Sequence, residues 1–195
     1  MPQPGRGGNL AGMRSVILLA LGLTLGCAHN TQSTHTAAEY PTDIKLEAES
    51  VTLEVKDART DSDITDGYNR LALPDDFAGE ASGRLQPILS KKGLAYKVTV
   101  SVVRCDGAKI DTQTGTKLHI EVGLKFEFRG PDNTVVKHGR GQSWGEVPEE
   151  QISDQSVAQT IRETALNAFD QYWADEDTIH NINENIATYR DRRGF

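Results

Sequence analysis

The chain has 195 residues, of which 25% are charged and 37% are apolar, and its formal net charge is −7. This size suits one globular domain with an appendage, and two cysteines are too few for a disulfide framework. Residues 1–26 hold Arg6 and Arg14 but no acidic residue, so the remainder has 19 basic and 28 acidic side chains, a charge of −9. So acidic a chain lacks the basic surface that binds phosphate backbones, and we expect no nucleic-acid partner.

The first predicted segment is a signal peptide over residues 1–26. An apolar run, VILLALGLTL (16–25), follows Arg14. As a helix it would rise about 15 Å, half the thickness of a bilayer's hydrocarbon core, so it is too short to span a membrane stably. It has the size of the apolar region of a signal peptide. Met13 is an alternative start to Met1, because MRSVILLALG begins the pattern directly.

The apolar run ends at Gly26-Cys27, which resembles the lipobox of bacterial lipoproteins, where a small residue precedes a cysteine that receives diacylglycerol. The departure is Thr24, where that pattern usually has leucine. We expect lipid attachment at Cys27, because cysteine is rare here and stands where the signal should end. The alternative is ordinary secretory cleavage after Ala28. Both interpretations export the protein, and in the resembled system Ala28 after the cysteine implies the outer membrane.

Residues 27–44 are polar, rich in small residues and aperiodic, which predicts a flexible, lipid-anchored tether. Residues 45–195 are expected to form a single periplasmic domain. If Cys27 is acylated, Cys105 has no partner within the chain. We expect a partly buried, unreactive thiol at Cys105, with an intermolecular disulfide as the alternative.

Hydrophobic periodicity predicts the first elements of the domain. Alternation over 51–55 indicates a half-buried strand, and the polar stretch 57–74 indicates a loop. A helix is expected to begin at Pro74 and to end at Gly93, with Pro87 as a kink.

Three strands are expected next, over 96–104, 117–130 and 135–144. The second has the clearest alternation, with apolar residues on one face and charged residues on the other. GPDNT (130–134) is predicted to be the hairpin turn that leads into the third.

Two amphipathic helices are expected to end the chain. Ser153 or Asp154 caps the first, and the second carries isoleucines at helical spacing from Ile179. The resulting order is β-α-β-β-β-α with an antiparallel meander and a short C-terminal helical tail. We therefore expect an α+β two-layer sandwich, whose charged sheet face meets water or a partner.

Ser143 lies in GQSWG (141–145), which matches the G-x-S-x-G nucleophile elbow of serine hydrolases. That chemistry needs the serine on a tight strand-to-helix turn, with an acid and a histidine converging on it. Asp175 and His180 follow in the right order, but Pro148 comes soon after the serine and no helix begins there. We expect no catalytic residue.

No metal or other cofactor is predicted. DSDITDG (61–67) resembles a calcium loop, but its glycine falls one place late and the twelfth position is Ala72 instead of glutamate. The histidines lack the paired spacing of a zinc site. They are His29, His35, His119, His138 and His180.

Four short motifs lie along the chain: Asp57-Ala58-Arg59, the helix closing at Gly93, VVKHG (135–139) and ALNAFDQYWADEDTIHNINENI (165–186). On these residues the chain resembles the YajG-like family of outer-membrane lipoproteins over residues 45–187. One departure is that the glycine after D-x-R comes later than in that family. The family has no established catalysis, so the resemblance transfers no catalytic residue. By analogy of fold it implies an accessory role in the envelope.

Together these patterns predict a lipid-anchored, non-catalytic binding or scaffolding module at the outer membrane, facing the periplasm. Its partners would be the membrane, through the lipid on Cys27, and an envelope protein. A tether of this length has a reach of roughly 20–25 Å. The alternatives are an envelope serine hydrolase using Ser143 and a small-ligand or lipid carrier with an apolar cavity between sheet and helices.

Overall fold

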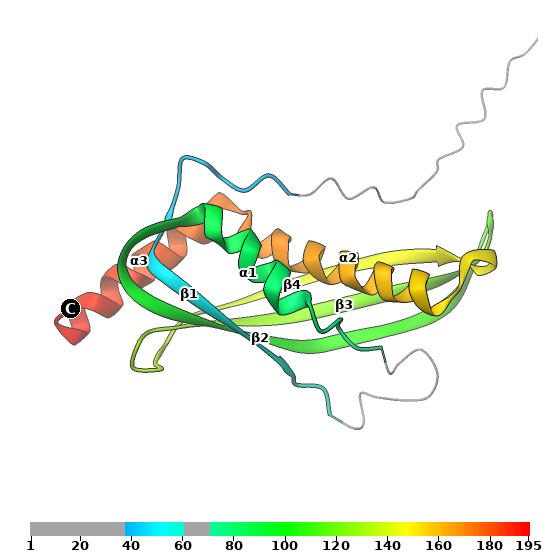
Figure 1. The fold of residues 1–195 in the computed structure, drawn as a ribbon, viewed down its shortest axis with the longest axis horizontal. Helices are drawn as coiled ribbons and strands as arrows, with labels where there is room; N and C mark the ends of the chain where they lie inside the picture. Colours follow the sequence, from blue (N-terminus) through cyan, green and yellow to red (C-terminus); the bar gives the residue numbers. More distant parts are fainter. Residues whose placement is uncertain (1–37, 61–70) are drawn as a thin grey trace, which may run out of the picture. The chain divides into compact units, whose positions relative to one another are not determined.

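The described part of the chain, residues 38–60 and 71–195 of a computed structural model, has an α+β fold with a four-stranded mixed sheet and three α-helices. These residues belong to one unit of the chain. In chain order the elements are β1 (Leu46–Asp57), α1 (Phe77–Leu85), β2 (Leu89–Thr112), β3 (Gly115–Arg129), β4 (Val135–Pro148), α2 (Asp154–Trp173) and α3 (Glu176–Arg193), with short 3-10 turns at Gln86–Ile88 and Glu149–Gln151 (Figure 1).

The strands lie in the order β1-β2-β3-β4. β2, β3 and β4 are consecutive antiparallel neighbours, whereas β1 is parallel to β2, so the sheet is mixed. The predicted hairpin turn is confirmed: Gly130 N–H donates to the Thr134 carbonyl at 2.9 Å, and Asn133 adopts a left-handed conformation with φ of 65°. Asparagine tolerates this conformation better than most residues, which explains its place in the turn.

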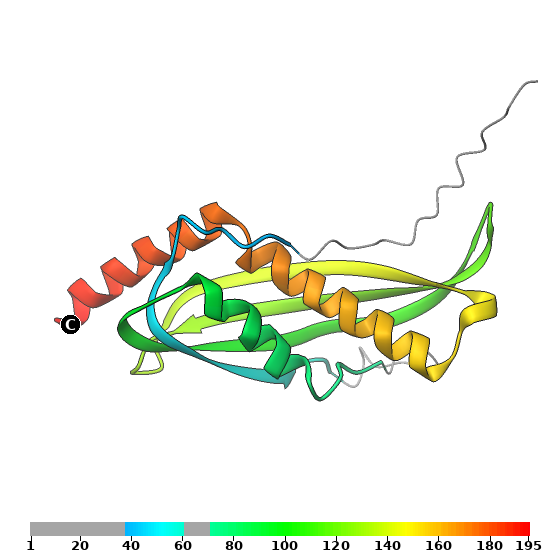
Figure 2. The ribbon, with the colours of Figure 1, turned by 45° about the horizontal axis from the view of Figure 1, so that its top comes forward.

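Strand alternation gives the sheet two different faces. The apolar residues of β3 all point to the helices and are at most 1% exposed: Leu118, Ile120, Val122, Leu124, Phe126 and Phe128. α1 and α2 contact each other and lie over the same side of the sheet (Figure 2). α2 contacts β3 and β4, α1 contacts β1, and α3 contacts β1 and β4. The core therefore lies between the three helices and one face of the sheet.

The first helix is shorter than predicted, and the expected end at Gly93 is wrong. α1 ends at Leu85, a 3-10 turn contains Pro87, and β2 already begins at Leu89. Proline lacks the N–H of a helical hydrogen bond, so the α-helix does not continue through Pro87. Gly93 lies inside β2 with φ of 98°, where a side chain in its place would meet Arg190 of α3.

The first C-terminal helix begins where the sequence predicts, and the second begins at Glu176, ahead of the first residue of its predicted apolar stripe, Ile179. Ser153 caps α2 through a reciprocal pair of bonds with Ser156, and Asp175 caps α3 by accepting from the Thr178 N–H at 2.9 Å. The predicted apolar stripe of α3 is confirmed, since all four of its residues are buried: Ile179, Ile182, Ile186 and Tyr189.

Folded structure begins earlier than the expected boundary at Lys45. Tyr40 and Ile44 pack against the core, although both fall inside the predicted tether 27–44. The predicted signal peptide and the lipid site at Cys27 lie outside the described residues. Among the described helices, none has the length and apolar character that crossing a membrane requires.

Candidate functional site: the open face of the sheet

Ser143 does not have the setting of a catalytic nucleophile. It lies inside β4, opposite Val122 of β3, and is only 5% exposed. The strand continues to Pro148, so no helix begins at the serine. The two other candidate residues have contacts elsewhere: Asp175 caps α3, and the exposed His180 lies 3.3 Å from Glu184. The structure therefore does not assemble a nucleophile, base and acid from these residues.

The glycines of GQSWG serve helix packing. A β-carbon on Gly141 would overlap the carbonyl oxygen of Ala168, and one on Gly145 would lie 2.6 Å from Thr164 Oγ1. Alternate residues on one face of a strand are about 7 Å apart, and residues four apart on a helix rise about 6 Å. A row of small residues on β4 can therefore run beside a row of small residues on α2. The motif is explained by this close approach.

Cys105 is buried, at 1% exposure, and is a free thiol. Burial raises the pKa of Cys105 to about 11. At neutral pH it is therefore protonated, and the thiolate is the reactive form. The expected burial of Cys105 is confirmed and is nearly complete, and its lack of reactivity stays a prediction.

The D-x-R motif forms a clamp at the two ends of the loop after β1. The Arg59 guanidinium pairs with Asp57 at 2.6 Å and donates to the carbonyl oxygens of Leu71 and Cys105, each at 2.8 Å. Its side chain is only 5% exposed, and Asp57 holds the pKa of this arginine above its usual range. This motif, one of the four on which the family resemblance rests, thus has a structural role.

No group of acidic, histidine and cysteine side chains in the described residues could hold a metal ion. The DSDITDG stretch falls outside those residues, as do His29 and His35. Of the remaining histidines, His138 is exposed, and its Nδ1 lies 4.0 Å from Glu127.

A buried carboxylate, Asp170 on α2, joins three segments of the chain. It is 1% exposed, accepts a hydrogen bond of 2.6 Å from the Tyr40 hydroxyl and pairs with Arg84 of α1. Burial raises the pKa of Asp170, against the opposite effects of Tyr40 and Arg84. Burial and the neighbouring carboxylate likewise raise the pKa of Tyr40. Sequence reasoning missed this cluster, because Asp170 lies within a helical pattern and Tyr40 within a polar stretch.

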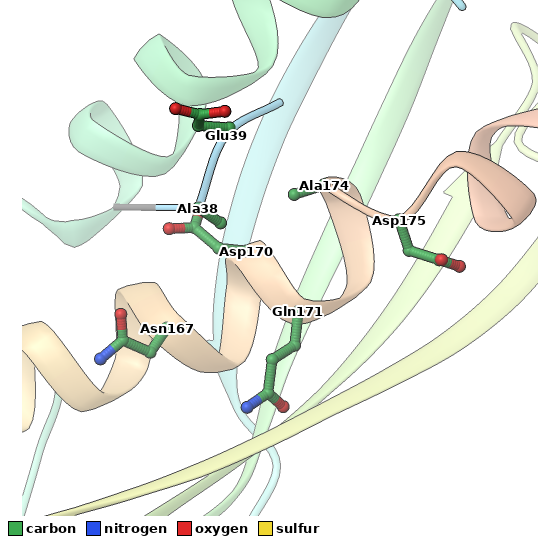
Figure 3. Close-up of a pocket in the computed structure, with 7 residues that line it drawn as sticks. All are labelled: Ala38, Glu39, Asn167, Asp170, Gln171, Ala174 and Asp175. Atoms are coloured by element: carbon green, nitrogen blue, oxygen red, sulfur yellow. The ribbon is translucent and has the colours of Figure 1, made fainter. Parts of the chain in front are cut away.

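Beside this cluster is a surface hollow of about 340 Å³ between α2 and the N-terminal segment, shown in Figure 3. Its lining includes Asp170, Gln171 and Glu39. The Asp170 carboxylate is already bound by Tyr40 and Arg84. We therefore interpret the cluster as a structural contact that holds the N-terminal segment on α2, and not as a ligand site.

The sheet face opposite the helices carries the charged residues of the strands. Register places Glu121 of β3 beside Trp144 of β4, and Lys125 beside Arg140. Most charges on this face form ion pairs, such as Arg104 with Glu121 at 2.9 Å. Pairs also join Lys56 to Glu54, Lys97 to Glu54, Lys117 to Glu146 and Arg129 to Glu127. We call this surface the open face.

Trp144 is the most unusual residue of the open face. It is 52% exposed, although a large aromatic side chain gains free energy from burial. Its ring stacks on His119 with centroids 5.4 Å apart and an interplanar angle of 29°. His119 is half-buried, and its Nδ1 has no hydrogen-bond partner among the described residues. Sequence reasoning noticed the serine beside Trp144 and missed the tryptophan itself.

The sequence matches no known family model and no curated protein. Among solved structures, it is similar to a candidate lipoprotein from Caulobacter crescentus CB15, with 14% identity, coverage of 74% of this chain and 93% of that chain, and a TM-score of 0.36. A minor lipoprotein from Acinetobacter baumannii has 13% identity, coverage of 74% and 95%, and a TM-score of 0.37. A candidate homolog of neuraminyllactose-binding hemagglutinin from Helicobacter pylori has 12% identity, coverage of 79% and 98%, and a TM-score of 0.37. Likenesses this distant assign neither a family nor a function to this chain, and the YajG-like family stays a prediction.

Proposed function

We propose that the protein is a lipid-anchored cell-envelope protein whose domain is a non-catalytic binding or accessory module. Its anchor is a lipid on Cys27, its location is the periplasmic side of the outer membrane, and its family is the YajG-like one. The lipobox-like junction and the apolar run before it support the anchor. The buried setting of Ser143 favours a binding module over a hydrolase.

The exposed Trp144 on the open face is the observation that carries the binding role. Helices cover the other face of the sheet, so the open face is the broad strand surface available to a ligand or partner. Trp144 presents a rigid aromatic ring there, held by His119. Aromatic side chains of this kind supply much of the free energy of binding when a partner covers them.

The carrier alternative receives no support from the core. The space between sheet and helices is occupied by aromatic rings in mutual contact. The ring centroid of Phe126 lies 5.7 Å from that of Phe169 and 6.0 Å from that of Trp173. The ring centroid of Phe77 lies 6.3 Å from that of Phe169. Packing of this kind fills the region where a carrier would need its apolar cavity.

The anchor is tested by Cys27→Ser in the full-length protein. Without the thiol no lipid can attach, so the protein should move from the membrane fraction to the soluble periplasm. Cys105→Ser is the matched control, because it removes the other cysteine and should leave the fractionation unchanged. Unchanged membrane association of Cys27→Ser would contradict the proposed anchor.

The binding role is tested by a photoreactive amino acid at Gln142, which is exposed on the open face two residues from Trp144. The control position is Gln159, exposed on α2. In intact cells, crosslinked products should form from Gln142 and disappear when Trp144→Ala is added. Equal products from both positions, or none from Gln142, would contradict binding at the open face.

A further inference from the structure

Two cations of the open face differ from the others. Lys125 of β3 and Arg140 of β4 are both exposed and lie directly opposite each other in the antiparallel register. Side chains in such a cross-strand pair have β-carbons about 5 Å apart, and like charges there repel. On its other side Lys125 faces Ser101 of β2, which is uncharged.

The nearby carboxylates are engaged elsewhere. Glu121 and Glu127 flank Lys125 along the same face of β3. Glu121 pairs with Arg104 at 2.9 Å and accepts from Gln142, and Glu127 pairs with Arg129. Within the described residues of β3 and β4, every other lysine or arginine on this face has a carboxylate partner, and Lys125 and Arg140 have none.

A hollow beside these two cations is lined by residues of β2, β3 and β4 and by Gln171 of α2. Its volume is about 360 Å³, and its lining includes Val103, Gly123, Lys125, Arg140, Gln142 and Gln171. Gly123 has no side chain to occupy the open face, and β2 has a register irregularity between Val102 and Arg104 opposite it. The glycine and the irregularity leave room on this part of the open face.

We propose that Lys125 and Arg140 bind a phosphate group in this hollow. The inference rests on the proposed binding role of the open face and specifies its ligand. A phosphate would neutralise two neighbouring positive charges that the protein leaves uncompensated, even though the chain as a whole has a net charge of −7. A guanidinium can hold phosphate oxygens with two parallel hydrogen bonds, and the lysine ammonium adds a point charge. Gln171, which also lines the hollow, offers a further amide group, and Gln142 keeps one N–H beyond the one that it donates to Glu121.

The hollow is open and small, so it suits a phosphate group and the few atoms attached to it. A volume of about 360 Å³ is at the lower end of the range for small-molecule sites. Two sources have this chemistry: a soluble phosphate ester and the headgroup of an anionic phospholipid. The latter would be within reach of a domain that is held beside a membrane by a short tether.

The test compares two double variants of the full chain with the same net charge, both carrying Cys27→Ser for solubility. Lys125→Gln with Arg140→Gln removes the proposed site. Lys92→Gln with Arg192→Gln is the control, because it removes two exposed cations that have no ion pair in the described residues and lie outside the hollow. Binding of inorganic phosphate is followed by amide chemical shifts at constant ionic strength. Phosphate affinity should fall at least about tenfold in the site variant and stay unchanged in the control.

Vesicles distinguish the two sources. If a phospholipid headgroup is the ligand, the protein should sediment with mixed phosphatidylcholine–phosphatidylglycerol vesicles and not with phosphatidylcholine alone, and the site variant should lose this binding. Binding of inorganic phosphate without vesicle binding would assign the site to a soluble phosphate ester. Equal binding by both variants, or none by the parent protein, would overturn the proposal.

A stability measurement shows whether the site variant is correctly folded. Relief of the repulsion should leave its thermal midpoint at low salt equal to or above that of the parent. Loss of phosphate binding with a lowered midpoint would overturn the assignment. If phosphate binding fails while open-face crosslinking from Gln142 persists, the phosphate site is wrong and the proposed function stands; absence of crosslinking removes the proposed function itself.

Discussion

Gly141 of β4 and Ala168 of α2 meet through their backbones: a β-carbon on Gly141 would overlap the Ala168 carbonyl oxygen. This oxygen belongs to the backbone of a long helix, so it cannot move aside as the end of a flexible side chain could. The contact joins the edge strand of the sheet to α2. It also explains a sequence motif that otherwise resembles an active site.

Gly141→Ala should lower the free energy of unfolding by about 2–3 kcal/mol, because the new methyl group forces β4 and α2 apart. Gly79→Ala is the matched control. Gly79 lies in α1, where an added β-carbon would meet nothing within 4 Å, so alanine there should stabilise by about 0.5–1 kcal/mol. Urea denaturation measures both. Equal effects at the two positions would contradict the close approach.

Arg59→Lys should lower the free energy of unfolding by about 2–4 kcal/mol. Lysine cannot bind Asp57 and the carbonyl oxygens of Leu71 and Cys105 at once, and the Arg59 side chain is nearly closed to solvent. Arg193→Lys is the control, because Arg193 pairs with Asp132 at a half-exposed position and should cost no more than about 0.5 kcal/mol. A similar small loss for both variants would show that the clamp contributes little.

Asp57→Asn should remove part of the loss of stability that the protein undergoes at acidic pH. Arg59 holds the pKa of Asp57 below its usual value of 3.8, so the folded protein releases this proton more easily than the unfolded chain. The stabilisation is therefore complete above pH 3.8 and is lost as the pH falls through the lower folded pKa. Urea denaturation of both proteins between neutral and acidic pH measures the difference. Parallel curves for the two proteins would contradict the pKa direction.

Tyr40→Phe should lower the free energy of unfolding by about 1.5–3 kcal/mol, because the Tyr40 hydroxyl donates to the buried carboxylate of Asp170. Tyr189→Phe removes a similar bond to the exposed Asp132 and should cost less. The pKa of Tyr40 is raised in the folded state, so the unfolded chain loses this proton first, and stability falls as the pH rises above 10. Tyr40→Phe should lack that part of the alkaline loss. No effect at any pH would mean that residue 40 belongs to the tether after all.

Cys105 should react with a thiol reagent only when the protein unfolds. In the Cys27→Ser variant it is the one cysteine of the sequence, so labelling reports on this thiol alone. Burial and a pKa of about 11 keep it protonated and covered. Labelling of the native protein should be slow, and labelling in concentrated urea immediate. An added Thr188→Cys, at an exposed position of α3, provides the rapidly reacting control. Immediate reaction of native Cys105 would contradict its burial.

Local pattern alone determined much of this fold. The alternation of β3, the GPDNT hairpin, the Ser153 cap and the buried stripe of α3 are all confirmed. Each depends on residues only a few positions apart, and such residues record in their order which face is buried and where a helix starts. The predicted export and the predicted lipid site rest on the same kind of local evidence, in residues that the structure does not describe, and both stay predictions.

The tertiary structure decided what depends on residues far apart in the chain. The parallel pairing of β1 with β2 is one example, and the meaning of GQSWG is another, because only the approach of α2 explains the glycines. The hydrogen bond from Tyr40 to Asp170 joins residues that are 130 positions apart in the sequence. Lys125 and Arg140 become a pair only through the register of β3 and β4. A sequence pattern indicates which side of an element is buried. Packing over the whole domain determines which other element covers that side and which surfaces stay open.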